Sequence, residues 1–381
     1  MAAHNRESAI SGAGVLASPN GHAGPRTLAA AGRESAGRPF EIDPLTDPRW
    51  GRLVDEHPQS SIFHTPQWLS ALQNAYGYRP LVLTTSGPGS PLTNGIVFCE
   101  VNSWLTGRRL VSLPFADHCE PLLAQSSDSD LPLLHALGEV SRRRVKSVEL
   151  RPVSWEPANA TAFRRSDQFV LHRVDLRPPI ETVYRGFHKD CIQRKIRRAE
   201  REQLDYQEGA SDELLEKFYR LLTVTRRRHG LPPQPIRWFR ALIGAFGSQL
   251  KIRTASKNGI AVASILTIAH RRTTVYKYGC SDHTASQYGG TPLIMWRAIQ
   301  DARAAGHEVF DMGRSDLDNP GLIAFKEHFG AQPSSLHYWM YPAAPWRVRN
   351  AGAGRLSHKI ISLAPDSVLQ MVGRLLYPHI G

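Results

Sequence analysis

The densest group of chemically capable side chains follows a short strand pattern near residue 310. The run VFDMG (309–313) predicts a strand, and Asp311 and Arg314 lie at its end. Lys326 follows in the next predicted helix, beside its apolar stripe. Ligands tend to bind where the strands of open α/β sheets end. A lysine there can hold an anion or a developing oxyanion, and a carboxylate can act as general base if burial raises its pKa. Structural ion pairs, Lys326–Asp311 or Asp311–Arg314, are the open alternative.

A second group is typical of an anion site at the start of a helix. The β-branched and aromatic run TTVYKYGCS (273–281) predicts a strand, and a helix is expected from about Thr291. The loop between them contains Gln287, Gly289 and Gly290. Glycines let a pyrophosphate approach the backbone closely, and the N–H groups and dipole of a helix start favour negative charge. Strand–turn–helix segments are common, so the pattern alone does not establish a cofactor site.

Two tyrosines lie in the middle of that strand. Tyr276 and Tyr278 are two residues apart, so both are expected to face the same side of the sheet. Core packing with a satisfied hydroxyl is the simpler role. A contact between Tyr278 and a substrate is the functional alternative.

A strongly basic helix is predicted from about His188 to Glu202. Its expected buried face consists of Ile192, Ile196 and Ala199. Lys195 and Arg198 are candidate contacts to the phosphates of a lipid-linked substrate or of RNA. A solvated face with salt bridges along the helix is the structural alternative.

Composition narrows the class of protein. The chain has 381 residues, 41% apolar and 21% charged, which suits one large or two ordinary domains. No run approaches the ~20 apolar residues of a membrane-spanning helix. The 47 Lys and Arg against 34 Asp and Glu give a net charge of +13. This charge favours phosphate-bearing substrates, nucleic acid or an anionic membrane as partners, without choosing among them.

Several familiar site patterns are absent from the sequence. Its four cysteines, Cys99, Cys119, Cys191 and Cys280, form no C-x-x-C pair, which favours a reducing compartment. Its histidines show no H-x-x-x-H or H-E-x-x-H spacing, so no metal is expected. The absence of the P-loop, of G-x-S-x-G and of G-x-G-x-x-G argues against P-loop kinases, serine hydrolases and dinucleotide-binding enzymes.

Helix and strand patterns recur in the same order in two stretches of the chain. Each stretch contains a helix, three strands, a loop, a further helix and a last strand, at Pro66–Val153 and Ser211–Tyr341. Thr65 is expected to cap the helix that Pro66 opens. The shared order suggests a duplicated α/β unit.

These patterns divide the chain into four expected segments. They are a disordered arm (1–39), a first unit (40–175), the basic helix with a second unit (176–345), and a basic and apolar tail (346–381). The arm lacks the apolar core of a signal peptide. For the tail, a short amphipathic helix on a membrane surface and a segment packed back on the domain are both open.

Several of these segments resemble the FemAB-like branch of the GNAT-type acyltransferases. The similar segments are FHTPQWLSAL, RRLVSLPFADHCEPLL, RKIRRAERE, RRRHGLPPQP, VYKYGCSD and FDMGRSDLDNPGLIAFKEHFGA, within roughly Phe40 to Tyr341. They are most similar to the group associated with exopolysaccharide and protein-sorting gene systems. The resemblance implies an α/β fold of two tandem GNAT-like units, each a mixed, mostly antiparallel sheet flanked by helices. The active site is then expected in the cleft between the units.

The resemblance also implies roles for individual residues. Lys326 matches the lysine of the family's F-K-x-x-F-G motif, whose inferred role is to stabilise the transferred carbonyl. Asp311, Gly313 and Arg314 match the D-x-G-R stretch before it. On this basis Asp311 or a water relay removes the amine proton, and Arg314 orients the acceptor. The first unit's motifs, thought to shape the acceptor cleft, are matched by His64, Trp68, Asp117 and His118.

Two donors are compatible with the resemblance. The better-known members take amino acids from aminoacyl-tRNA and extend the lipid-linked muropeptide, whereas others resemble acyl-CoA-dependent N-acyltransferases. No long heptad stretch corresponds to the helical arm that several tRNA-using members insert, which favours acyl-CoA. The Q/R-x-x-G-x-G/A pyrophosphate signature of ordinary GNAT enzymes is echoed only in Gln287–Gly290.

We therefore expect an N-acyltransferase that moves an acyl group from acyl-CoA to an amine on a cell-envelope or exopolysaccharide-related substrate. The expected CoA contacts are Gln287, Gly289, Gly290 and Thr291, and further acceptor contacts are Tyr278, Lys195 and Arg198. Aminoacyl-tRNA as donor is the first alternative, and a non-catalytic protein that binds anionic glycolipid or nucleic acid is the second. The acceptor is expected to be a small or lipid-linked amine, and the location cytoplasmic or at the inner face of the membrane.

Overall fold

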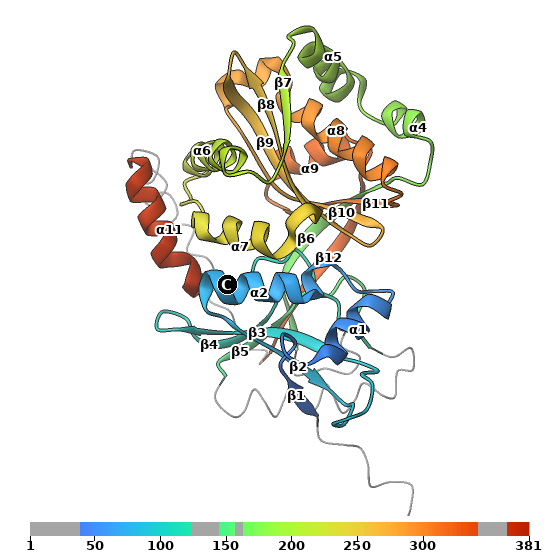
Figure 1. Ribbon diagram of the computed structural model, residues 1–381, viewed down its shortest axis with the longest axis vertical. Coiled ribbons are helices and arrows are strands. Elements are labelled where there is room, and N and C mark those ends of the chain that lie inside the picture. The colour runs from blue at the N-terminus through green and yellow to red at the C-terminus, as the bar shows by residue number, and fades with distance from the viewer. Residues whose placement is uncertain (1–38, 124–144, 157–162, 342–363, 381) are drawn as a thin grey trace, which may run out of the picture. The chain divides into compact units, whose positions relative to one another are not determined.

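One continuous sheet runs through the computed structural model of the chain, which describes residues 39–123, 145–156, 163–341 and 364–380 (Figure 1). The strands are β1 (Phe40–Ile42), β2 (Arg79–Thr84), β3 (Ile96–Ser103), β4 (Gly107–Ser112), β5 (Ser147–Leu150), β6 (Arg164–Asp175), β7 (Asp205–Gly209), β8 (Leu250–Lys257), β9 (Ile260–His270), β10 (Thr273–Ser281), β11 (Val309–Asp316) and β12 (Gln332–Tyr341). Their order is β1-β2-β3-β4-β5-β12-β6-β11-β10-β9-β8-β7. Among these described strands only β4 with β5 and β10 with β11 pair in parallel.

The sheet consists of two halves that exchange a strand. In the first half β2, β3 and β4 are antiparallel neighbours and β5 is parallel to β4; β8, β9, β10 and β11 repeat this arrangement in the second. However, β6 follows β5 in the chain and pairs with β11, whereas β12 pairs with β5. β6 and β12 pair with each other at the centre. The predicted α/β class with a mostly antiparallel sheet is confirmed, and the two expected sheets are joined into one.

Helices cover both faces of this sheet (Figure 1). The α-helices are α1 (Pro48–Glu56), α2 (Pro66–Tyr76), α4 (Ile180–Arg185), α5 (Arg194–Arg201), α6 (Asp212–Arg228), α7 (Ile236–Phe246), α8 (Gly290–Ala304), α9 (Pro320–Glu327) and α11 (Asp366–Ile380). Shorter 3₁₀ turns lie at Ile62–His64, Gly247–Gln249 and His283–Tyr288, and a π-helical turn at Lys189–Gln193 precedes α5.

The predicted cap at Thr65 is present, and two further helices begin with a cap of the same kind. The side chains of Thr65, Ser211 and Asn319 each accept a hydrogen bond from a backbone N–H of the first turn of α2, α6 and α9. Because these caps rest on neighbouring residues, the sequence predicts them well. By contrast, α1, β1, β6, α4 and β7 were not expected from the sequence.

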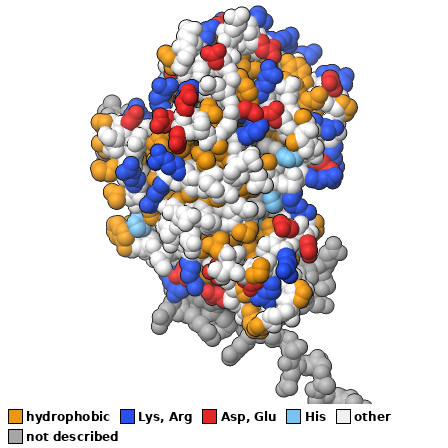
Figure 2. Space-filling model, viewed as in Figure 1, with side chains coloured by type: hydrophobic (Ala, Val, Ile, Leu, Met, Phe, Trp, Pro, Cys, Tyr) orange, Lys and Arg blue, Asp and Glu red, His pale blue; other side chains and the backbone are white. Residues whose placement is uncertain are grey.

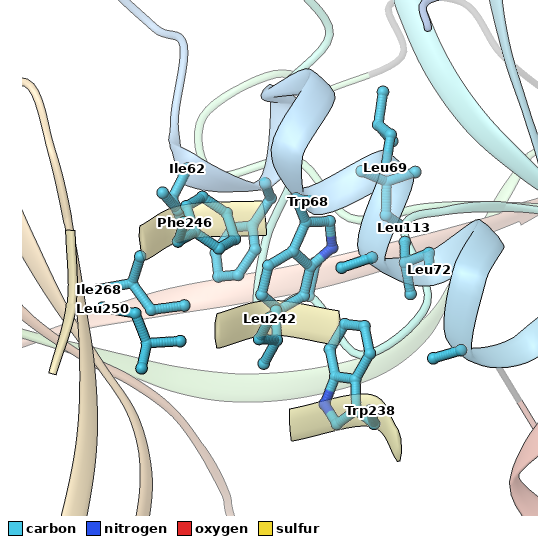
Figure 3. Close-up of a cluster of buried hydrophobic side chains, with 14 of the residues drawn as sticks. Ile62, Trp68, Leu69, Leu72, Leu113, Trp238, Leu242, Phe246, Leu250 and Ile268 are labelled. Atoms are coloured by element: carbon cyan, nitrogen blue, oxygen red, sulfur yellow. The ribbon is translucent and has the colours of Figure 1, made fainter. Parts of the chain in front are cut away.

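The two halves share a hydrophobic core. α2 of the first half and α7 of the second lie side by side (Figure 3). Trp68 of α2 meets Trp238 of α7 edge to face, with ring centroids 5.3 Å apart, and both indoles are fully buried. Leu113 of the first half and Leu250 and Ile268 of the second belong to the same cluster. Separating the halves would therefore expose a large apolar surface to water.

A β-bulge corrects the expected placement of the two tyrosines. The pairing of β10 with β9 shifts register between Tyr276 and Tyr278. Tyr278 belongs to the cluster under α2, α6 and α7, whereas Tyr276 packs against the cluster under α5 and α8. Lys277 is the extra residue of the bulge, so the two tyrosines face opposite sides of the sheet instead of one.

Some expectations fall wholly or partly outside the described residues. These are the disordered arm up to residue 38, the helix predicted at 131–144, and the tail between residues 342 and 363. The division near residue 175 stays a prediction; β6, which ends there, pairs with strands of the second half. None of the described helices is long and apolar enough to span a bilayer.

Candidate functional site

The loop Phe115–His118 of the first half lies where β10 and β11 separate. The parallel pairing of these strands ends at Val275 and Asp311, and each strand then bulges. The loop reaches Gly313 so closely that an added Cβ would lie 3.1 Å from the Asp117 carboxylate. Gly313 has a φ of +69°, which favours glycine for a second reason. The site is therefore assembled from both halves, with Asp117 and His118 delivered by the loop.

His118 and Asp311 form a buried pair across the two halves. His118 Nε2 lies 3.1 Å from Asp311 Oδ2, and Arg173 of β6 donates to the same oxygen at 3.1 Å. Burial alone would raise the pKa of Asp311, but the hydrogen bond with His118 and the charge of Arg173 hold that pKa well below its usual value. The raised pKa on which a general-base role for Asp311 depended is thus not found. Asp311 is instead an ionised group that orients His118.

A cavity of about 570 Å³ opens beside this pair. His118 and Asp311 line it together with Arg173, and the rest of its wall comes from both halves of the sheet. The exposed Arg271, at the turn between β9 and β10, donates to the carbonyl of His57 and thus joins the halves at its rim. The cavity brings a polarised imidazole to an enclosed space, which is the arrangement needed for proton transfer.

On the opposite side of the loop, Asp117 pairs with Lys277. Lys277 Nζ donates to Asp117 Oδ2 at 2.8 Å, and its side chain is 6% exposed. Burial alone would raise the pKa of Asp117, but the Lys277 ammonium holds it below its usual value. Both residues line a second cavity, of about 370 Å³. Its other charged lining residues are Arg151, Arg226 and Arg314. Four cations against one carboxylate favour an anionic ligand there.

Arg314 is held in this second cavity by aromatic rings. Its guanidinium carbon lies 4.0 Å from the ring centroid of Phe169 and 5.1 Å from that of Tyr338. Such stacking leaves the planar edge of a guanidinium able to bind a carboxylate or phosphate. The Asp311–Arg314 ion pair, one of the structural alternatives left open by the sequence, is not found between these described residues, since Asp311 pairs with His118 and Arg173.

Lys326 lies beneath the strand end and not in a cavity wall. It is 2% exposed, and its Nζ donates to the carbonyls of Gly313 and Arg314, both at 2.8 Å. Burial lowers its pKa to about 8. Lys326 therefore fixes the backbone that passes Asp117. The alternative of a direct Lys326–Asp311 ion pair is not found between these described residues.

The predicted CoA contacts lie together at the start of α8, against which the backbone of α5 packs closely. Gly289 has a φ of +75°, and an added Cβ would lie 2.2 Å from the backbone carbonyl oxygen of Lys195 in α5. Gly290 packs on the side chains of Val262 and Ala263 of β9. Gln287 and Thr291 flank these glycines. Gly289 is thus required by its positive φ and by the close approach of α5, and a pyrophosphate-binding role for these residues stays a prediction.

Other predicted residues are buried in supporting positions. His64 is 1% exposed and contacts the carbonyl of Glu120 through Nε2 at 2.7 Å, and burial lowers its pKa to about 4. Trp68 lies in the core, and the hydroxyl of Tyr278 accepts from Trp238 Nε1 at 2.8 Å while Tyr278 also lines the second cavity. His64, Trp68 and Tyr278 thus support the loop and core around the site, whereas Arg198 of the basic helix pairs with Glu202 on the surface.

One group among the described residues lies within metal-ligand reach. Ligand atoms of His188, Cys191 and His328 are all within 4.8 Å of one another. However, His188 Nδ1 accepts hydrogen bonds from the backbone N–H groups of Asp190 and Cys191. His188 Nδ1 is therefore already engaged by the backbone and is not a free ligand atom.

Sequence reasoning missed Lys277, Arg173 and the cavity role of Arg226. A charged residue inside the otherwise aromatic strand TTVYKYGCS was a usable signal for Lys277, because buried lysines are rarely unpaired. Arg173 lies 138 residues from Asp311 in the chain, and His118 lies 193 residues away. Patterns of neighbouring residues carry no information about contacts between residues so far apart in the chain.

Known proteins match the chain over different spans. Residues 187–327 match the family of the acetyltransferase (GNAT) domain. The UDP-N-acetylmuramoylpentapeptide-lysine N(6)-alanyltransferase of Weissella viridescens is 25% identical over 138 residues, which span 35% of this chain and 41% of that protein. The crystal structure of FemX superposes with a TM-score of 0.61 at 13% identity, over 78% of this chain and 96% of that one.

A further solved structure extends the similarity in fold. L-PGS from Bacillus licheniformis superposes with a TM-score of 0.50 at 16% identity, covering 85% of this chain and 98% of that one. At these identities the superpositions establish the fold alone. The family match covers Asp311, Lys277 and all of α9, whereas Asp117 and His118 come from outside it.

Proposed function

We propose that this chain, a FemAB-like protein of the GNAT acyltransferase type, joins an amine to an acyl group taken from an aminoacyl ester. The observation that carries the proposal is the loop of the first half, which places His118 against Asp311 where β10 and β11 of the GNAT domain separate. The reaction would therefore depend on both halves.

The start of α8 supports an ester donor over acyl-CoA, which reverses the preference drawn from the sequence. A CoA pyrophosphate would need the helix N-terminus beside Gly289, and the Lys195 carbonyl packs directly against that glycine. An aminoacyl ester of a tRNA has no pyrophosphate to place there. The similarity to an alanyltransferase of peptidoglycan precursors supports the same donor class.

The proposed step breaks the ester C–O bond and forms an amide C–N bond. The neutral amine attacks the carbonyl carbon, and negative charge develops on the carbonyl oxygen. His118, oriented by Asp311, takes the proton that the amine loses and returns it to the departing alkoxide. The products are an amide and a free hydroxyl, so no oxidant, metal or further reactant is needed.

Lys326 is assigned a positioning role in this scheme. Its ammonium holds the carbonyls of Gly313 and Arg314, which fixes the strand end against Asp117. Errors of about 1 Å in such alignment lower rates by ~10²-fold. The oxyanion role inferred from the family resemblance would fall to the third N–H of the ammonium, since the two carbonyls occupy only two of its donors.

The second cavity supports an acceptor that carries negative charge. Arg226, Arg314 and Lys277 surround a space in which Asp117 is the only carboxylate among the charged lining residues. An amine attached to a phosphate-bearing, lipid-linked envelope precursor has this chemistry. The acceptor would place its phosphates there and reach past the loop with its amine.

A donor competition tests the proposal. The purified chain is given UDP-N-acetylmuramoyl-pentapeptide bearing lysine as a probe acceptor, with either a mixture of aminoacyl-tRNAs or acetyl-CoA, and amide products are identified by mass spectrometry. We expect product from the aminoacyl-tRNAs that disappears in His118→Ala. Equal or faster transfer from acetyl-CoA would overturn the ester donor. Absence of product from both donors with a panel of amine-bearing lipid-linked precursors would favour a non-catalytic binding protein.

A further inference from the structure

Helix α11 packs on the domain through one apolar face. Leu369 is 1% exposed, and Gly373 lies so close to Pro233 that an added Cβ would be 2.1 Å from its carbonyl oxygen. The hydroxyl of Tyr78 donates to the backbone carbonyl of Tyr377 at 2.9 Å, and the hydroxyl of Tyr377 donates to the carbonyl of Pro232 at 3.1 Å. Of the two roles left open for the tail, packing on the domain is thus observed for this helix.

The opposite face of the same helix is apolar as well, and it is exposed. Four side chains at helical spacing form an outer stripe, with exposed fractions of 39% for Val368, 55% for Met371, 36% for Val372 and 67% for Leu375. Hydrophobic side chains gather along the left edge of the molecule in Figure 2, where Figure 1 places α11. A helix that is apolar on two opposite faces is normally covered on both.

The outer stripe continues onto the turn between β3 and β4. Trp104 in this turn is 85% exposed, and its Nε1 donates to His379 Nε2 of α11 at 3.1 Å. Leu105 beside it is 57% exposed, and Ile380 is 49% exposed. An exposed tryptophan next to leucine and isoleucine is typical of segments at the boundary between water and lipid.

The charges around the stripe are suited to anionic lipid. Asp366, the only acid in α11, pairs with Arg227 of α6, while Arg374 of α11 is exposed. Tyr377 and Ile380 also line the second cavity, in which four cations face one carboxylate. An apolar surface thus borders a cationic cavity, and anionic amphiphiles have the complementary pair of properties.

We propose that α11 and the β3–β4 turn dock on the surface of an anionic bilayer. The helix lies in the plane of the membrane with Val368, Met371, Val372 and Leu375 among the lipid tails. The second cavity then opens at the level of the headgroups, where a lipid-linked acceptor would present its phosphates. The docking is independent of turnover, so it can be tested whether or not the proposed reaction occurs.

Vesicle flotation without donor or acceptor tests the docking. The purified chain is mixed with vesicles of phosphatidylcholine containing 30% phosphatidylglycerol, or of phosphatidylcholine alone, in about 0.1 M salt. We expect binding to the anionic vesicles, and a loss of at least about tenfold in the partition coefficient for Leu375→Glu, which removes apolar contact and adds repulsion. Ile260→Glu is the matched control, because Ile260, the first residue of β9, is 62% exposed, and this variant should bind as the wild type does.

The outcomes separate this proposal from its alternatives. Both variants change exposed side chains, so circular dichroism should show an unchanged fold. Wild-type protein that stays with neither kind of vesicle would overturn the docking. A dimer in sedimentation velocity that Leu375→Glu abolishes, without vesicle binding, would assign the outer stripe to a second copy of the chain. Equal losses in Leu375→Glu and Ile260→Glu would show that net charge, and not this face, controls the binding.

Discussion

The two cavities on either side of the Phe115–His118 loop differ in their charge balance. In the first cavity Arg173, Arg271 and Arg272 are matched by Glu120, Glu308 and Asp311. In the second, Arg151, Arg226, Lys277 and Arg314 face Asp117 alone. Where the charges are balanced, a local pair such as His118–Asp311 can act on a single proton. Where cations are in excess, their field attracts an anion. In the proposed function, two neighbouring residues of one loop thereby separate the reaction from recognition of the acceptor.

The largest effect is expected from the His118–Asp311 pair. Asp311→Asn keeps the shape but removes the charge that orients the imidazole, and kcat should fall by ~10² to 10⁴-fold. Glu100→Gln is the matched control, since Glu100 is 7% exposed and pairs with Arg79 and Arg108 in the first half. If the single-turnover rate fell equally in both variants, the loss would not be specific to the first cavity, and its proposed role in the reaction would be wrong.

Substitution of Lys326 distinguishes a positioning role from direct stabilisation of the oxyanion. Lys326→Met leaves two buried carbonyls without a partner, which should lower the free energy of unfolding by about 2–4 kcal/mol, and turnover should fall by ~10²-fold. Urea denaturation and steady-state kinetics on the same preparation measure both quantities. A loss of kcat with unchanged stability would instead assign Lys326 to the oxyanion.

His64 lies in neither cavity, so its titration should change stability without changing turnover. Its pKa is about 4 in the folded chain because of burial, and about 6.5 when unfolded. The unfolded chain therefore binds more protons in this window, and stability rises with pH from 4 to 6.5. Between pH 7 and pH 5 the wild type should lose about 2 kcal/mol more than His64→Asn in urea denaturation. An equal loss in the two proteins would contradict a neutral, buried His64.

The smallest expected effect is a change in KM, and it tests whether the second cavity binds the acceptor. Arg226→Ala should raise the KM of an anionic acceptor by about tenfold, with kcat nearly unchanged, because one charge-assisted contact is lost. Arg271→Ala removes one positive charge from the rim of the first cavity and should leave KM within about twofold. If both variants raise KM equally, the contrast in charge balance does not govern recognition.

The sequence predicted those parts of the site that depend on neighbouring residues. Asp311, Gly313, Arg314 and Lys326 lie together as expected, because a strand and its capped helix fix their spacing. The partners of Asp311 were not predicted, since His118 and Arg173 reach it only through strand pairing between the halves. The surroundings of the glycines before α8 were not predicted for the same reason: the Lys195 carbonyl that packs against Gly289 comes from another helix.

The exchanged strands also determine when the chain can complete its fold. While the chain is being synthesised, β5 has emerged long before residues 332–341, which form its neighbour β12. Until then one side of β5 has unpaired backbone groups, the kind of edge that recruits other strands. β6 likewise has neither of its partners until β11 and β12 appear. The first half thus reaches its final state only when nearly the whole second half has left the ribosome, which makes the chain dependent on protection of these edges during translation.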